Sequence, residues 1–122
     1  MLMSWVFSSD RPIYSQLVEQ LSLRIVTGVF PPGSRFDTVR DLAAEFEVNP
    51  NTVQRAMSEL ERLELVRAER TAGRFVTDDV QRIADLRAQL VKEKATAFLR
   101  EMSKLGFERS EIITLLEKED TI

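Results

Sequence analysis

The side chains best suited to chemistry in this sequence are hydrogen-bonding groups that follow a proline at helical spacing. Asn51, Gln54 and Arg55 lie three and four positions apart, so a helix beginning at Pro50 places them on one face. Asn and Gln can hydrogen-bond an adenine edge through two atoms at once, and Arg can bind guanine in the same way. A face selected only for solubility would more often carry Glu and Lys. The pattern therefore favours recognition of nucleic-acid bases.

Most catalytic chemistry is excluded by the residue types that the chain lacks. Its 122 residues include no Cys and no His, which excludes disulfides, Cys/His zinc sites, Cys nucleophiles and Ser-His-Asp triads. We find no paired-acid motif, no phosphate-binding loop and no metal-binding spacing. We therefore expect a protein that is not an enzyme and that uses no cofactor or metal.

Arginine is distributed unevenly along a chain whose net charge is -3. Up to Asp78 the sequence has nine Arg and no Lys, whereas the rest also contains Lys92, Lys94, Lys104 and Lys118. The planar guanidinium matches the geometry of phosphates and guanine edges, which the Lys ammonium does not. The change in composition indicates two parts with different functions. We place them at residues 1–78 and 79–122.

No segment is suited to crossing a membrane. The longest apolar run is far shorter than the ~20 residues that a spanning helix needs. Residues 1–7 are apolar but lack a basic start, and Asp10 and Arg11 follow at once, so we expect no signal peptide. These features predict a cytoplasmic protein without a membrane partner.

Apolar spacing predicts three helices in the first half of the chain. The first runs from Pro12 to Thr27, and the second is short and extends from residues 37–38 to Glu47. The third has the best-marked start, with Asn49 as N-cap and Pro50 as its first residue. The second and third are separated by only a few residues, which is typical of a helix-turn-helix unit.

A β-hairpin is predicted to follow these helices. Residues 65–69 and 74–77 have strand character, and residues 70–73 form the turn that Gly73 allows. Arg35 and Phe36 are candidates for a further short strand. The predicted fold is thus mainly α with a small β-hairpin wing, a winged helix-turn-helix followed by a helical tail.

The tail, residues 79–122, is predicted to mediate dimerisation. Apolar residues recur at helical spacing from Asp78 to Leu105, Gly106 can end this helix, and Ser110 can cap a further short one. An amphipathic helix is marginal in water unless it packs against a partner, and a second copy is the simplest one. A ligand pocket is the less common explanation for such a stripe. The residues expected at the dimer interface are Ile83, Leu90, Val91, Phe98 and Met102.

The stretch from Pro12 to Asp78 resembles the winged-helix domain of GntR-type bacterial transcription regulators. The similarity is carried by collinear motifs: Pro12-Ile13-Tyr14 with Gln16, Pro32-Gly33-Ser34-Arg35, Val39-Arg40-Asp41-Leu42-Ala43, Val48-Asn49-Pro50-Asn51-Thr52-Val53 and Gly73-Arg74-Phe75-Val76. The box around Pro50 and the short tail are similar to the small YtrA-like branch. The chain departs from the family at Phe36-Asp37-Thr38, where Leu-Pro-Ser is usual, and at Arg74, where Thr is usual.

The resemblance implies a DNA-binding surface made by the third helix, the second helix and the wing. Arg40 matches the arginine of the second helix that reaches DNA in the family. An alternative for Arg40 is a surface ion pair with Asp37 or Glu45, and for Asn49 it is a role as N-cap alone. Arg67 can instead pair with Glu69. The predicted DNA-binding residues are Arg40, Asn49, Asn51, Thr52, Gln54, Arg55, Arg70, Thr71, Gly73 and Arg74.

The leading hypothesis is a transcription regulator that binds double-stranded operator DNA. By resemblance it acts as a homodimer on a palindromic operator, as a repressor, with transporter genes among its targets. A small-molecule effector is compatible with the sequence, but no motif indicates one. The alternative is a winged-helix protein-interaction module, which would expose apolar rather than polar residues around Asn51 and Gln54.

Overall fold

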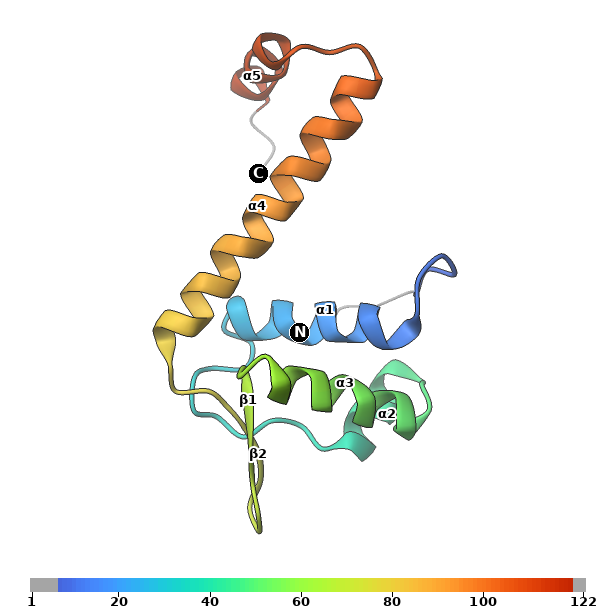
Figure 1. Ribbon diagram of the computed structural model, residues 1–122, viewed down its shortest axis with the longest axis vertical. Helices are drawn as coiled ribbons and strands as arrows, with labels where there is room; N and C mark the ends of the chain where they lie inside the picture. The colour runs from blue at the N-terminus through green and yellow to red at the C-terminus, as the bar shows by residue number, and fades with distance from the viewer. Residues whose placement is uncertain (1–6, 120–122) are drawn as a thin grey trace. The chain divides into compact units, whose positions relative to one another are not determined.

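The computed structural model describes residues 7–119, and within them it contains five helices and one antiparallel hairpin (Figure 1). The chain divides into two compact units between Ala84 and Asp85. In chain order the elements are α1 (Ile13–Val26), α2 (Val39–Phe46), α3 (Pro50–Arg62), β1 (Val66–Glu69), β2 (Gly73–Val76), α4 (Val80–Lys104) and α5 (Arg109–Lys118). The predicted mainly helical fold with a hairpin wing is confirmed. The functional boundary at Asp78 stays a prediction, and most of the apolar start at residues 1–7 lies outside the described residues.

The core of the first unit forms where α1 packs on α3 (Figure 1). Leu17, Leu21 and Ile25 follow one another every four residues on α1 and are almost completely buried. Residues from α3, including Val53, Met57 and Leu60, form the facing surface. Burial of a large apolar side chain contributes about 1.5–3 kcal/mol, so this contact fixes the position of α3.

The helix starts are set by the side chains that the sequence placed there. Thr38 caps α2, because its hydroxyl oxygen accepts a hydrogen bond of 3.1 Å from the Asp41 N–H. Asn49 caps α3 in the same way, accepting from the Asn51 N–H at 2.7 Å. α1 begins at Ile13, one residue later than predicted, with Pro12 in the extended conformation before it.

Both turns that flank α3 contain a glutamate in the left-handed region of backbone space. Glu47 has φ 55° and lies between α2 and α3, and Glu64 has φ 62° and lies between α3 and β1. Residues with a side chain lose roughly 1–2 kcal/mol in this conformation relative to the right-handed one. The short turns therefore keep their shape at a cost in stability.

The wing is a hairpin whose three-residue turn, residues 70–72, connects Glu69 to Gly73. Gly73 has φ 98°, which a residue with a side chain rarely adopts. Residues 34–36 also pair with β2: the Phe36 N–H donates to the Arg74 carbonyl at 2.8 Å, and the Val76 N–H donates to the Ser34 carbonyl at 2.9 Å. The strand predicted at Arg35 and Phe36 is thus a single bridge along the edge of the wing.

The second unit comprises most of α4 together with α5. Gly106, with φ 86°, follows α4 as predicted. The prediction that Ser110 caps the last helix is wrong, because α5 already begins at Arg109. The reason is that Glu108 and Glu111 form a capping box, in which the Glu108 N–H donates to the Glu111 carboxylate at 2.9 Å.

Many apolar side chains of the second unit are exposed. They are Val91, Phe98, Leu105, Phe107, Ile113, Leu115 and Leu116. Ile112 is the large apolar side chain of α5 that is buried, with 3% exposure. No helix in residues 7–119 is both long and apolar enough to span a membrane.

Candidate nucleic-acid interface

The exposed side of the N-terminal half of α3, residues 50–56, is polar, and Arg55 is its charged residue. Asn51 and Gln54 are exposed, one helical turn apart, while Thr52 is half-buried beside them. Asn49 uses its side-chain oxygen to cap the helix, so its amide N–H groups remain available as donors. α3 is strongly amphipathic, because its opposite face is buried in the core. This face therefore combines hydrogen-bonding groups with the N–H groups of a helix N-terminus.

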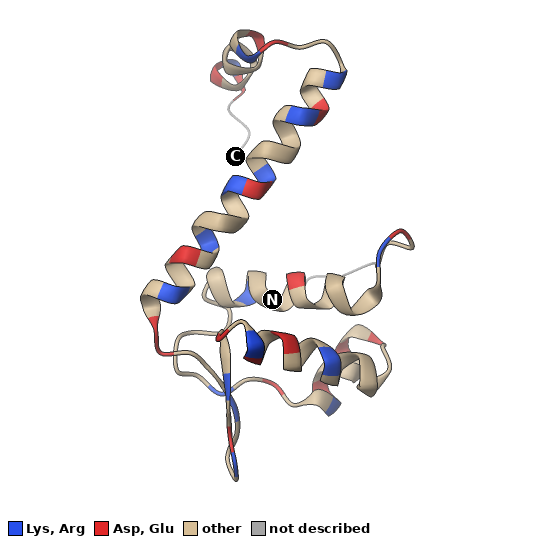
Figure 2. Ribbon diagram, in the orientation of Figure 1, with Lys and Arg blue, Asp and Glu red and all other residues tan. Residues whose placement is uncertain are grey.

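Acidic and basic residues both occur along α3 and the hairpin rather than one sign alone (Figure 2). Because carboxylates lie among the arginines of these elements, the electrostatic attraction of DNA depends on individual arginines. The nine arginines of the first 78 residues differ in their partners. Five of them pair with carboxylates, namely Arg11, Arg24, Arg62, Arg67 and Arg74.

Three of the remaining arginines, Arg35, Arg40 and Arg70, have no ion pair or side-chain hydrogen bond among residues 7–119, and all three are exposed. Their guanidinium groups are therefore available to phosphates. Arg40 and Arg70 were predicted from the sequence. Arg35 was not, although it belongs to the Pro32-Gly33-Ser34-Arg35 motif that carried the resemblance.

The surface pair considered for Arg40 does not form. Glu45, one of its two potential partners, binds Arg24, and both side chains of that pair are mostly buried. Arg24 also lies over the Phe46 ring, 4.9 Å from the centroid. Partial desolvation, together with the nearby charges of Glu45 and Asp41, raises the pKa of Asp37, the other potential partner. Among residues 7–119 no ion pair joins Asp37 to Arg40, so Arg40 stays unpaired in the first turn of α2.

Arg55 is the remaining arginine, and it stacks on Tyr14. The centre of its guanidinium lies 3.7 Å from the centroid of the Tyr14 ring, which joins α3 to the first turn of α1. Tyr14 is half-buried under this contact. Arg55 is thus held toward α1, whereas Asn51 and Gln54 have no such restraint.

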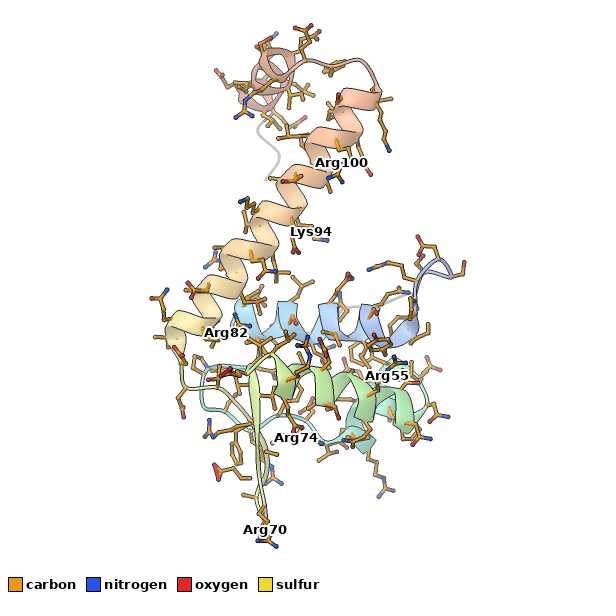
Figure 3. All side chains as sticks on the ribbon, in the orientation of Figure 1. Arg55, Arg70, Arg74, Arg82, Lys94 and Arg100 are labelled. Carbon is orange, nitrogen blue, oxygen red and sulfur yellow. The ribbon has the colours of Figure 1, made fainter. Side chains whose placement is uncertain are left out.

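The wing brings its predicted residues to two different places. Arg70 and Thr71 are exposed in the turn, and Figure 3 shows Arg70 at the tip of the hairpin. Arg74 lies nearer α3, and its Nε is 2.6 Å from the Glu61 carboxylate. The alternative considered for Arg67 is confirmed, because its guanidinium contacts Glu69 at 3.4 Å and also Asp78 at 3.1 Å.

Arg35 lies alongside β2 of the wing. A Cβ added to Gly73 would lie 3.4 Å from an Arg35 Nη atom, which places this guanidinium against the Gly73 backbone. The Arg35–Phe75 bridge fixes the main chain at that point. The motif at residues 32–35, shortly before α2, is the one sequence signal for a role of Arg35. Its pairing with β2 is a tertiary contact, which the sequence does not predict.

The residues predicted for dimerisation fall in both units. Ile83 is half-buried and belongs to the first unit, and Leu90, Val91, Phe98 and Met102 belong to the second. Within the second unit, Val91 is 61% exposed and Phe98 39% exposed. Phe98 follows Val91 by seven residues and Met102 follows Phe98 by four, so these three side chains share one face of α4.

The arrangement of three helices, a tight turn before α3 and a hairpin after it defines a winged helix-turn-helix protein. Comparison with known proteins agrees. The model of the family "Bacterial regulatory proteins, gntR family" matches residues 13–76. The chain belongs to this family, and it is a transcriptional regulator with a DNA-binding domain rather than an enzyme.

Two relatives from Bacillus subtilis cover most of the chain. The uncharacterized HTH-type transcriptional regulator YhcF is 36% identical over 107 residues, which are 88% of each chain. The HTH-type transcriptional repressor YtrA is 31% identical over 97 residues, which are 80% of this chain and 70% of YtrA.

Solved structures extend the similarity to the whole fold. A GntR family transcriptional regulator from Listeria monocytogenes is 39% identical, with a TM-score of 0.86 over 93% of this chain and 100% of that one. The DNA-binding domain of AraR in complex with operator ORX1 is 27% identical, with a TM-score of 0.54 over 62% of this chain and 93% of that one. That neighbour binds operator DNA.

Proposed function

We propose that this regulator is a repressor that binds a palindromic operator as a homodimer, with α3 reading bases in the major groove. The observation that carries the proposal is the exposed, uncharged pair Asn51 and Gln54 on the N-terminal half of α3. Unpaired arginines stand on the neighbouring elements, which is the division between base contacts and phosphate contacts found in protein–DNA interfaces. The operator complex of the neighbour AraR supports the same use of the fold.

Each group in the site has a distinct role in this proposal. Gln54 and Asn51 hydrogen-bond base edges, for which both amide side chains are suited. Thr52, Asn49 and the first N–H groups of α3 bind a phosphate, because a helix N-terminus attracts anions. Arg40 binds a phosphate from α2. Arg55 contributes less, because its guanidinium is stacked on Tyr14.

The wing supplies further contacts to the DNA backbone. Arg70 and Thr71 reach it from the tip of the hairpin, and the backbone at Gly73 allows the close turn that presents them. Arg35 adds a contact from beside β2, where its guanidinium lies against Gly73. These residues sit outside α3, so they position the protein on the duplex and carry little sequence information.

Dimerisation is assigned to the tail, residues 79–122, and DNA binding to residues 1–78. The exposed apolar side chains of α4 and α5 support a second copy as the partner, since large exposed apolar patches mark interaction sites. A two-fold symmetric pair presents two copies of α3 about 34 Å apart, one turn of DNA. Phe98→Asp is then expected to yield monomers in multi-angle light scattering at micromolar concentration. A wild-type monomer would contradict this assignment.

The repressor role and the link to transporter genes rest on similarity to the YtrA-like branch, and YtrA itself is named a transcriptional repressor. An interaction module without DNA binding is less well supported, because the surface around Asn51 and Gln54 is polar rather than apolar. No described feature supports an effector.

The direct test is fluorescence anisotropy with duplex DNA from upstream of the protein's own gene. We expect tight binding that falls steeply with salt and resists competition by a scrambled duplex. Equal affinity for both duplexes would contradict specific recognition of this DNA. Absence of binding at low salt would instead support the interaction module.

A further inference from the structure

The ion pair between Arg74 and Glu61 connects the wing to the recognition helix. Glu61 lies in the last turn of α3 and Arg74 lies in β2, thirteen residues later. Arg74 Nε is 2.6 Å from Glu61 Oε2. The side chains are 24% and 32% exposed, so solvent screens this pair less than it screens an exposed one.

The position of the pair is poorly suited to contact DNA. Glu61 is ten residues after Asn51, which corresponds to about 15 Å along the helix axis. In the proposed complex the N-terminal end of α3 enters the groove, so the pair lies toward the far end of the helix. Figure 3 shows Arg70 at the tip of the hairpin and Arg74 closer to α3. Arg74 thus faces the recognition helix, while Arg70 extends away from it.

The wing needs contacts with other elements to hold its direction, because its own structure is a single hairpin. A two-stranded hairpin is marginally stable unless other elements pack on it. The main chain of Arg74 is held on one side by the Phe36 N–H, which donates to its carbonyl at 2.8 Å. Its side chain adds the attachment to α3. Together these contacts restrain β2 from two directions.

We propose that Arg74 is a positioning residue, whose ion pair with Glu61 fixes the direction of the wing relative to α3. This inference rests on the proposed DNA binding and replaces the direct DNA contact predicted for Arg74 from the sequence. With the pair intact, Arg70 and Thr71 meet the DNA backbone while α3 is in the groove. Without it, the wing samples other directions, and its contacts form less often.

The two roles for Arg74, positioning the wing through Glu61 or contacting DNA directly, predict opposite changes in operator affinity for Glu61→Gln. Glu61→Gln removes a negative charge, so if Arg74 contacted DNA directly, this variant would bind operator at least as tightly as the wild type. The positioning role predicts weaker binding, by about three- to tenfold, which is in the range of coupling between contacting residues. Arg74→Gln should weaken binding by a similar factor, and the double variant by no more than either. Glu59→Gln is the matched control, because Glu59 pairs with the exposed Arg62 on the same helix.

Two further readouts separate positioning from folding. The exchanged pair, Glu61→Arg with Arg74→Glu, should recover most of the lost affinity. Hydroxyl-radical footprints of the single variants should lose protection at the wing and keep it where α3 binds. Tighter or unchanged binding by Glu61→Gln overturns the inference, as does an additive double variant.

Amide hydrogen exchange of the free protein tests the positioning role even if no operator is bound. Glu61→Gln should speed exchange in β1 and β2 while the amides of α1 keep their rates. Unchanged exchange in the wing overturns the inference. Failure of the wild type to bind any specific duplex contradicts the proposed function instead, so the two failures are distinguishable.

Discussion

Replacement of Arg40 by Ala should reduce the salt dependence of operator binding by a predictable amount. Arg40 is exposed and pairs with no carboxylate among the described residues, since Glu45 binds Arg24. Its removal should therefore change the free energy of unfolding by no more than about 0.5 kcal/mol. Each phosphate contact contributes ~0.9 to the steepness of log K against log salt. If each subunit of a dimer loses one contact, the slope should therefore become shallower by ~1.8.

The difference in slope predicts how the affinity ratio of the wild type to Arg40→Ala changes with salt, which anisotropy titrations can measure. Between about 50 and 200 mM salt, the affinity advantage of the wild type over Arg40→Ala should shrink by ~12-fold for a dimer and by ~3- to 4-fold for one contact. Arg62→Ala serves as the matched control, because Arg62 is an exposed arginine that already pairs with Glu59. Its slope should match that of the wild type. Parallel salt curves for the wild type and Arg40→Ala would refute the phosphate contact.

Three further predictions concern base recognition, stability and pH. Gln54→Ala should change which bases are preferred at one operator position, at about 1–3 kcal/mol for the lost contact, and unchanged selectivity in a competition series would remove Gln54 from the site. Glu47→Gly and Glu64→Gly should each raise the free energy of unfolding by up to ~1 kcal/mol, because relief of the positive φ exceeds the added backbone entropy of glycine. Urea titrations measure this, and a loss of stability in both variants would argue against strain at these turns. The pKa of Asp37 is raised in the folded state, so folding favours its protonated form, and stability should decline as pH rises from its unfolded pKa through the folded one. Asp37→Asn should flatten that decline in thermal melts recorded across this rise in pH, and an unaltered pH profile would count against the predicted role of Asp37.

The local structure followed from the sequence where neighbouring residues determine it. The caps Thr38 and Asn49 act through hydrogen bonds to backbone groups two or three residues away, so sequence spacing predicts them. The buried stripe of α1 follows from the four-residue recurrence of Leu17, Leu21 and Ile25. The predicted start of α5 is wrong because Glu108, two residues before Ser110, forms a capping box with Glu111 and so begins the helix earlier.

Tertiary partners of charged side chains did not follow from the sequence. Nine arginines in the first 78 residues look alike in a sequence, and their roles depend on which carboxylates the fold brings close. Arg74 meets Glu61 thirteen residues away, and Arg24 meets Glu45 twenty-one residues away. Arg35 has no carboxylate partner among residues 7–119 and Arg74 has one, a difference that sequence position alone does not predict.

Base reading by α3 is tested most directly by a crystal structure of the protein with the DNA duplex that it protects in footprinting. We expect α3 to lie in the major groove with Asn51 and Gln54 about 3 Å from base edges. We also expect Arg40 and Arg70 to contact phosphates, and Arg74 to remain bound to Glu61. A complex in which α3 lies outside the groove, or in which these two amide side chains face only solvent, would contradict base reading by α3.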